Sequence, residues 1–195
     1  MKATIFLLSV FLSLVSCSKD SSSSGFQLPP ETQTGANTFG VTIKGKVYIP
    51  RDPTGHGIGP TSTGMTLWGA TNYSWYEIEV KDGASAVGFN MFIHMQPLAG
   101  VGQIMLHQSN FHNNVDSTPF SHIYFKIWDS NISNYAYYGS LANQGEINVT
   151  RLDSGLFSGN FKGKFVRYGN PNDFITIIDG RFDINGFTLP NAVFP

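Results

Sequence analysis

The chain is 195 residues long, has a formal net charge of −1, and contains 13 % charged residues. That charged share is about half the usual value for soluble domains. Lys and Arg form no basic run or stripe, which excludes the nucleic-acid-binding classes that need one, so we expect no nucleic-acid partner. The length indicates a single folded domain.

The first residues have the pattern of a signal peptide. Met1-Lys2 provides a short positive start, and residues 3–15 follow without any charge. This apolar stretch is shorter than the roughly 20 residues of a membrane-spanning helix, but it has the length of a signal-peptide core. Leu, Val and Ser then precede Cys17, which is typical of a lipobox, where the cysteine thiol accepts a diacylglycerol. We predict a lipoprotein signal peptide over residues 1–16 and lipidation of Cys17.

The alternative is an ordinary secretory peptide with a chance cysteine. Cys17 is the only cysteine of the chain, so no disulfide can form, and this favours the lipobox. Residues 17–36 are rich in Ser and Pro, and we predict that they form a flexible tether. Ser18 is compatible with transfer to the outer membrane, because Asp at that position is the usual inner-membrane retention signal. We therefore expect an outer-membrane lipoprotein that faces the periplasm or the cell surface, with the membrane as partner through its N-terminal lipid.

Residues 37–195 show the two-residue alternation of β-strands, and no window has a helical period. Apolar residues that share a strand face include Val41, Ile43, Val47 and Ile49, then Tyr76, Ile78 and Val80, then Ile123, Phe125 and Ile127, then Phe157, Phe161 and Phe165, and last Phe174, Ile178, Phe182 and Ile184. Asp179-Gly180 interrupts the last set, and we interpret it as a bulge through which the even-numbered apolar face continues. The alternative is a two-residue hairpin turn.

Turn residues such as Asp153-Ser154-Gly155 separate the strands, and two longer loops cover residues 50–64 and 108–121. The pattern predicts an all-β domain of about 8–10 antiparallel strands. We favour a β-sandwich, and a closed or partly open β-barrel is the alternative. The Phe and Gly alternation over residues 157–165 fits the strong curvature of a barrel equally well.

Two stretches resemble a known family. Residues 28–50 read LPPETQTGANTFG followed by VTIKGKVYIP, and residues 145–184 contain GEINVTRLD, FSGNF and DGRFDI. These stretches are similar to a family of small Gram-negative lipoproteins catalogued as a domain of unknown function. The resemblance implies lipid anchoring and a β fold, and it transfers no catalytic residue.

A metal site is one hypothesis for function. His107, His112 and Asp116 lie close together in the sequence, and His94 and His122 fall on neighbouring predicted strands. Two imidazoles and a carboxylate are suitable ligands for a divalent ion. The spacing of the histidines fits neither a helix face nor a strand face, so the alternative is a set of loop and strand histidines without metal.

An aromatic binding surface is a second hypothesis. Tyr135, Tyr137 and Tyr138 form a Tyr-rich segment, which we expect at a strand end beside the loop of residues 108–121. Exposed aromatic rings suit glycans, peptides or partner proteins of the cell envelope. The alternative is that these rings, with Trp128, belong to the core.

Catalysis is a third hypothesis. Glu77 and Glu79 share a strand face, as do Asp179 and Asp183 with Arg181 between them, and paired carboxylates can hydrolyse glycosides. Such pairs on open strands are more often solvated charges, and no hydrolase or phosphate-binding motif is present. The sequence therefore favours a non-catalytic binding or structural accessory role without a cofactor. The rival interpretation is a hydrolase that acts on envelope or extracellular polymers.

Overall fold

Antiparallel strands dominate the structure, a computed structural model that describes residues 25–54, 63–69, 75–96, 100–112 and 119–195. The elements in these residues are β1 (Thr38–Ile43), β2 (Lys46–Tyr48), β3 (Met65–Gly69), β4 (Tyr76–Lys81), β5 (Asn90–Met95), β6 (Gly102–Met105), β7 (His122–Asp129), β8 (Asn134–Asp153), β9 (Leu156–Arg167), β10 (Asn170–Asn185) and the short 3₁₀ helix η1 (Leu189–Asn191). In this described part of the chain, no helix has the length and apolar character needed to cross a bilayer. The all-β prediction is confirmed.

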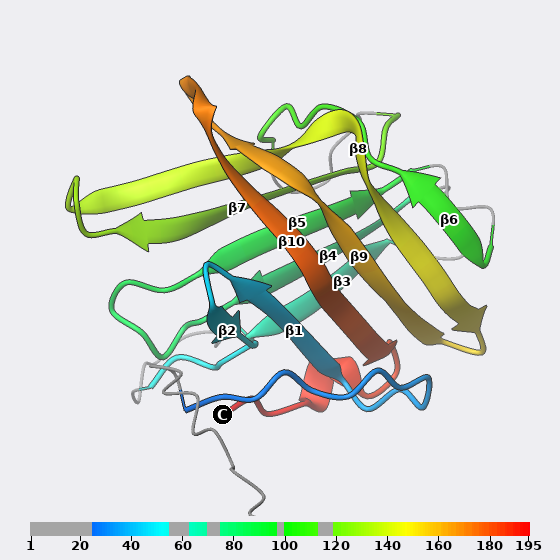
Figure 1. Ribbon diagram of the computed structural model, residues 1–195. Helices are drawn as coiled ribbons and strands as arrows, with labels where there is room; N and C mark the ends of the chain where they lie inside the picture. The colour runs from blue at the N-terminus through cyan, green and yellow to red at the C-terminus, as the bar shows by residue number, and fades with distance from the viewer. Residues whose placement is uncertain (1–24, 55–62, 70–74, 97–99, 113–118) are drawn as a thin grey trace, which may run out of the picture.

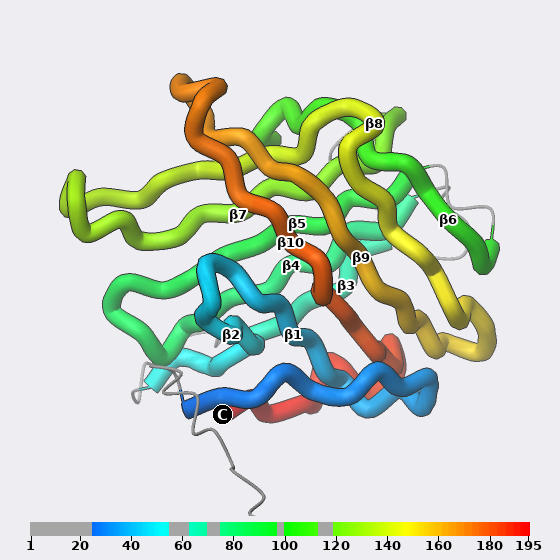
Figure 2. The backbone as a smooth tube through the Cα atoms, in the orientation of Figure 1, coloured from blue at the N-terminus to red at the C-terminus, as the bar shows by residue number. Residues whose placement is uncertain are grey.

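The strands form one continuous sheet in the order β2-β1-β10-β9-β8-β7-β5-β4-β3, and β6 pairs with β8 outside this path. Figures 1 and 2 show that the sheet curls into a half-barrel, with the long strands β8, β9 and β10 crossing it obliquely. The first part of β8 pairs with β7 and its later part with β6, so β8 connects two sides of the curl. A register shift between Ser140 and Gly145 lies where β8 bends.

The hydrophobic core fills the concave face of the half-barrel. Phe157, Phe161 and Phe165 are at most 2 % exposed, which confirms the face predicted for them. The ring of Phe161 lies only 2.2 Å from the position that a Cβ on Gly180 would take. Glycine is therefore required at position 180, where β10 pairs with Phe161 of β9. Each buried phenylalanine contributes roughly 1.5–3 kcal/mol through removal of its surface from water.

The predicted bulge at Asp179-Gly180 is confirmed. The register of β10 against β9 shifts between Ile177 and Gly180, where β10 contains one extra residue. The prediction that the even-numbered apolar face continues through it is wrong, because Ile178 is 79 % exposed and Ile177 is buried. An extra residue reverses the side on which every following side chain lies, so the buried face changes from odd to even numbers at the bulge.

Residues 25–37 form an ordered segment, the N-terminal strap, which crosses one end of the half-barrel (Figure 2). Arg181 donates a hydrogen bond to the Pro29 carbonyl at 3.1 Å. Asp183 accepts hydrogen bonds from the Thr32 hydroxyl at 2.6 Å and from the Gly35 backbone N–H at 2.9 Å. The prediction of a flexible tether up to residue 36 is therefore wrong for residues 25–36, which belong to the folded domain.

Candidate functional site

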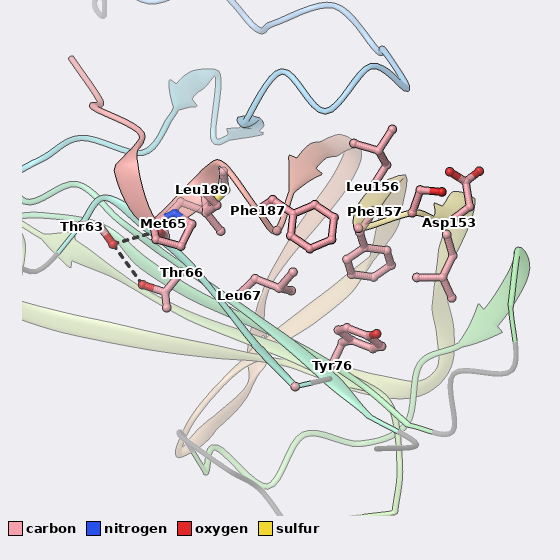
Figure 3. A pocket seen from close by; sticks show the side chains of 16 residues that line it. Thr63, Met65, Thr66, Leu67, Tyr76, Asp153, Leu156, Phe157, Phe187 and Leu189 are labelled. Carbon is pink, nitrogen blue, oxygen red and sulfur yellow. Dashed lines mark hydrogen bonds between the residues drawn. The ribbon is translucent and has the colours of Figure 1, made fainter. Parts of the chain in front are cut away.

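A cavity of about 630 Å³ opens at the end of the half-barrel that the N-terminal strap crosses. Its walls come from β3, from the turn between β8 and β9, and from the segment between β10 and η1. Figure 3 shows Leu67, Phe157 and Phe187 arranged around a common space, with Tyr76 and Leu156 beside them. We call this cavity the β3 pocket.

The turn between β8 and β9 forms one wall through its backbone conformation. Ser154 has φ 45° and Gly155 has φ 79°, the left-handed conformation of both residues in a tight two-residue hairpin turn. The Asp153-Ser154-Gly155 turn predicted from the sequence is thus confirmed. The ring of Phe187 lies where a Cβ of Gly155 would point, 2.3 Å from that position, so Gly155 allows this ring to lie against the turn.

The opposite wall is the edge of the sheet. Among the described strands β3 pairs only with β4, so its second edge lies along the pocket. Tyr76, at the start of the neighbouring strand β4, also lines the pocket and packs on Phe157, with ring centroids 5.3 Å apart. This contact joins β4 to β9 across the curl of the sheet, and both rings line the pocket.

Polar groups lie at two ends of the otherwise apolar β3 pocket (Figure 3). The Thr63 hydroxyl donates to the Met65 carbonyl at 2.9 Å and lies 3.2 Å from the Thr66 hydroxyl. Asp153 lies at the other end, where its carboxylate accepts a hydrogen bond from Arg151 at 3.0 Å. Asp153 is the one acid among the described lining residues, and none of them is a histidine. The arrangement suits an apolar ligand with a polar end better than acid–base chemistry.

The structure separates the three tyrosines of the predicted binding segment. Tyr135 and Tyr137 lie on the convex face of the half-barrel, where Tyr137 is 45 % exposed. Tyr135 packs edge-to-face on Trp128, which is 38 % exposed, with ring centroids 5.5 Å apart. Lys126 covers the Tyr135 ring at 4.8 Å. These rings form a small aromatic patch on the convex face.

Tyr138 requires a correction, because its side chain is fully buried on the core face. Its hydroxyl donates to Asp173 at 3.1 Å and accepts a hydrogen bond from Lys44 at 3.3 Å. Burial raises the pKa of the Tyr138 hydroxyl. Successive residues of a strand point to opposite faces, so Tyr137 and Tyr138 cannot belong to one surface. Tyr138 is thus a core residue with a polar partner.

The predicted metal ligands are not assembled in the described part of the chain. His107 packs against Phe120 with ring centroids 4.8 Å apart, and His112 is exposed. Asp116 lies outside the described residues, as does Cys17. Within the described residues, no group of three or more His, Cys, Asp or Glu side chains is placed to hold a metal ion.

A buried polar cluster on the convex face was not predicted. Register places Glu77 opposite His94, and His94 opposite His122. The Glu77 carboxylate lies 3.4 Å from Nδ1 of His94, and the Ser109 hydroxyl lies 3.1 Å from Nδ1 of His122. The backbone of Ser109 also bonds to Ser140 at 2.9 Å, so the cluster fixes the segment after β6 onto the sheet. The sequence places His94 and His122 on neighbouring strands, but their contacts with Glu77 and Ser109 follow only from the structure.

The carboxylate pairs considered for catalysis are separated as well. Glu79 forms an ion pair with Lys81 at 2.9 Å, while Glu77 belongs to the buried cluster. Asp179 accepts a hydrogen bond from the Thr42 backbone N–H at 3.1 Å, and Asp183 holds the N-terminal strap. Each of these four carboxylates therefore has a structural partner.

Comparisons with known proteins give no relative. No protein-family model, no curated protein and no solved structure matches the chain. The resemblance to small Gram-negative lipoproteins therefore depends on the residues quoted above alone, and a function has to be argued from the site itself.

Proposed function

We propose that this chain is an exported lipoprotein, anchored to the outer membrane through Cys17, whose half-barrel binds a small apolar ligand in the β3 pocket. The proposed role is non-catalytic binding. The observation that carries it is the apolar cavity of about 630 Å³ between β3 and the turn of β8 and β9. Pockets for single small ligands usually measure 300–1,000 Å³ and combine apolar walls with a few polar groups.

The anchoring part of the proposal is supported by the sequence. The apolar stretch of residues 3–15 ends at Cys17, the single cysteine of the chain. Ser18 supports passage to the outer membrane. These features match those of the lipoprotein family that residues 28–50 resemble.

The binding part is supported by the chemistry of the pocket walls. Leu67, Leu156 and Phe187 offer apolar surface, and a ligand gains about 0.8 kcal/mol for each methylene that it buries. The hydroxyls of Thr63 and Thr66 offer hydrogen bonds to a polar end group. An amphipathic molecule with one alkyl chain satisfies both kinds of wall.

A calorimetric titration with dodecanoate tests the binding. The protein is the mature chain of residues 17–195 with Cys17→Ser, which removes the anchor without altering the described domain. Leu67→Trp fills part of the pocket with the larger indole ring. We expect it to weaken dodecanoate binding by about tenfold or more, because the ring takes the space of two or more methylenes of the ligand. Ile178→Trp is the matched control, because Ile178 is 79 % exposed on the convex face.

Unchanged binding by Leu67→Trp would place the ligand elsewhere, and the absence of binding by the unsubstituted pocket would reject the proposal. Thermal unfolding of each variant confirms that it is folded. Loss of binding in Ile178→Trp alone would place the ligand on the convex face and reject the β3 pocket as its site.

The aromatic patch supports a second candidate function, the binding of a glycan or a peptide. Trp128 and Tyr137 are 38 % and 45 % exposed, and Tyr135 packs on Trp128. Flat aromatic surface with polar tips suits such ligands. A hydrolase is not favoured, because the described residues that line the β3 pocket include one acid, Asp153, whose carboxylate is bonded to Arg151.

A further inference from the structure

The N-terminal strap lies at the same end of the half-barrel as the turn between β8 and β9 and the segment after β10 (Figures 1 and 2), and these two segments line the β3 pocket. At its start, Gln27 and Pro29 share a shallow groove with Val193 and Phe194 near the C-terminus. At its far end, Gly35 lies directly against Leu156, a residue of the pocket wall. The strap therefore runs along this end from the C-terminal residues to the pocket.

The strap is fixed to the sheet over its length. Asp183 accepts hydrogen bonds from Thr32, Thr34, Gly35 and Ala36. Nearer the start, Arg181 donates to the Pro29 carbonyl at 3.1 Å. The position from which the chain leaves the domain toward Cys17 is consequently set by the fold.

The chain between this position and the proposed lipid is short. Residues 17–24 span at most roughly 30 Å even when fully extended. A domain of this length has a diameter of about 40 Å. Because the linker is shorter than the domain is wide, the end that carries the strap must stay close to the bilayer.

Exposed apolar side chains lie on this same end. Phe187 at the pocket wall is 76 % exposed, and Val193 beside the start of the strap is 87 % exposed. Each would move from water into an apolar medium if this end touched the acyl region of a bilayer. The tether length and these two side chains thus favour the same orientation.

We propose that this end of the half-barrel rests on the bilayer in which the lipid of Cys17 is inserted, and that the β3 pocket takes up an acyl chain from a lipid of that bilayer. The inference depends on the proposed lipidation and on the proposed pocket. It adds the orientation of the domain and the chemical class of the ligand, a long-chain lipid supplied by the membrane.

A fluorescence quenching experiment tests the orientation. The acylated mature lipoprotein is reconstituted into phosphatidylcholine vesicles with Phe187→Cys, and the new thiol is labelled with bimane. Because Cys17 is the only natural cysteine and its thiol is acylated, the label has one target. The matched control is Tyr168→Cys. Tyr168 is 71 % exposed and belongs to the turn between β9 and β10, which lies at the opposite end of the half-barrel from the strap (Figure 1).

Lipids with a nitroxide on the acyl chain are expected to quench the label at position 187 by at least about twofold, and to leave the label at 168 unchanged, since the nitroxide acts only on groups at the acyl boundary. Equal emission with and without nitroxide at position 187 overturns the orientation. Quenching at 168 alone, or a response at 187 that depends on protein concentration and not on lipid, overturns it in favour of another face or of a second copy.

The source of the ligand is tested on the same vesicles. Unlabelled, acylated protein with the natural pocket is expected to remove a pyrene-labelled phospholipid from a donor vesicle, and Leu67→Trp is expected to remove none. Failure of this removal despite dodecanoate binding by the Cys17→Ser chain would reject the membrane as the source and leave the pocket proposal standing. Failure of both would reject the pocket itself.

Discussion

Asp183 offers the sharpest test of how the strap is held. Its side chain is 1 % exposed and accepts hydrogen bonds from the Ser158 hydroxyl at 2.6 Å, the Thr32 hydroxyl at 2.6 Å and several backbone N–H groups of the strap. Burial alone would raise its pKa, but the hydrogen bonds from Ser158, Thr32, Ala36 and Gly35 outweigh burial and lower the pKa from 3.8 to about 2. The charged form of Asp183 is therefore stabilised in the folded state.

The size and pH range of the effect follow from this shift. A pKa change from 3.8 to about 2 corresponds to about 2 kcal/mol of stability. Because the unfolded chain binds the proton first, this stability is present above pH 4 and is lost as the pH falls toward 2. Asp183→Asn also leaves N–H donors facing an amide, so we expect a loss of roughly 2–4 kcal/mol at pH 7.

Urea unfolding of the Cys17→Ser mature chain between pH 2 and 7 measures both quantities. Asp179→Asn is the matched control, because within the described residues the Asp179 carboxylate accepts one backbone hydrogen bond, from Thr42 at 3.1 Å. Its loss should remain near 1 kcal/mol. A loss below about 1 kcal/mol for Asp183→Asn, or an unchanged stability difference between pH 4 and 2, would show that the charged Asp183 does not hold the strap.

Three further predictions concern the core, the anchor and the convex face. Phe161→Ala should cost about 3–5 kcal/mol in urea unfolding, because its ring packs on Phe39 and covers Gly180; a cost under about 1 kcal/mol would contradict its place in the core. Cys17→Ala should abolish labelling with a clickable fatty acid and release the protein from membranes, and equal labelling of the variant would reject the lipobox. Trp128→Ala combined with Tyr137→Ala should remove any glycan or peptide binding seen on an array without changing dodecanoate binding; binding that survives both changes excludes the aromatic patch.

The strand pattern predicted the fold class well and the faces of single strands less well. Phe157, Phe161 and Phe165 lie in the core as their spacing predicts. Ile178 does not, because the extra residue of the predicted bulge at Asp179-Gly180 reverses the buried side, whereas the prediction carried the same apolar face through the bulge. The sequence places Tyr138 in one Tyr-rich segment with Tyr137, but neighbouring strand residues face opposite sides, so the two side chains cannot share a surface.

The candidate pocket could not be predicted from the sequence, for a different reason. Its walls come from β3, from the turn between β8 and β9, and from residues after β10, which are distant along the chain and meet only because the sheet curls. The turn at Ser154-Gly155 was predicted, but nothing local indicates that Phe187 packs against it. The attachment of the strap to the sheet could not be predicted either, because the polar residues of the strap resemble a linker. Their partner, Asp183, lies near the end of the chain.

The position of a bound ligand tests the proposed β3 pocket most directly. A crystal structure of the Cys17→Ser mature chain with 12-bromododecanoate locates the bromine by its anomalous signal. We expect a bromine peak in the β3 pocket, between Leu67, Leu156 and Phe187. A bromine peak beside Trp128 and Tyr137, with the β3 pocket free of ligand density, would show that the β3 pocket is not the binding site.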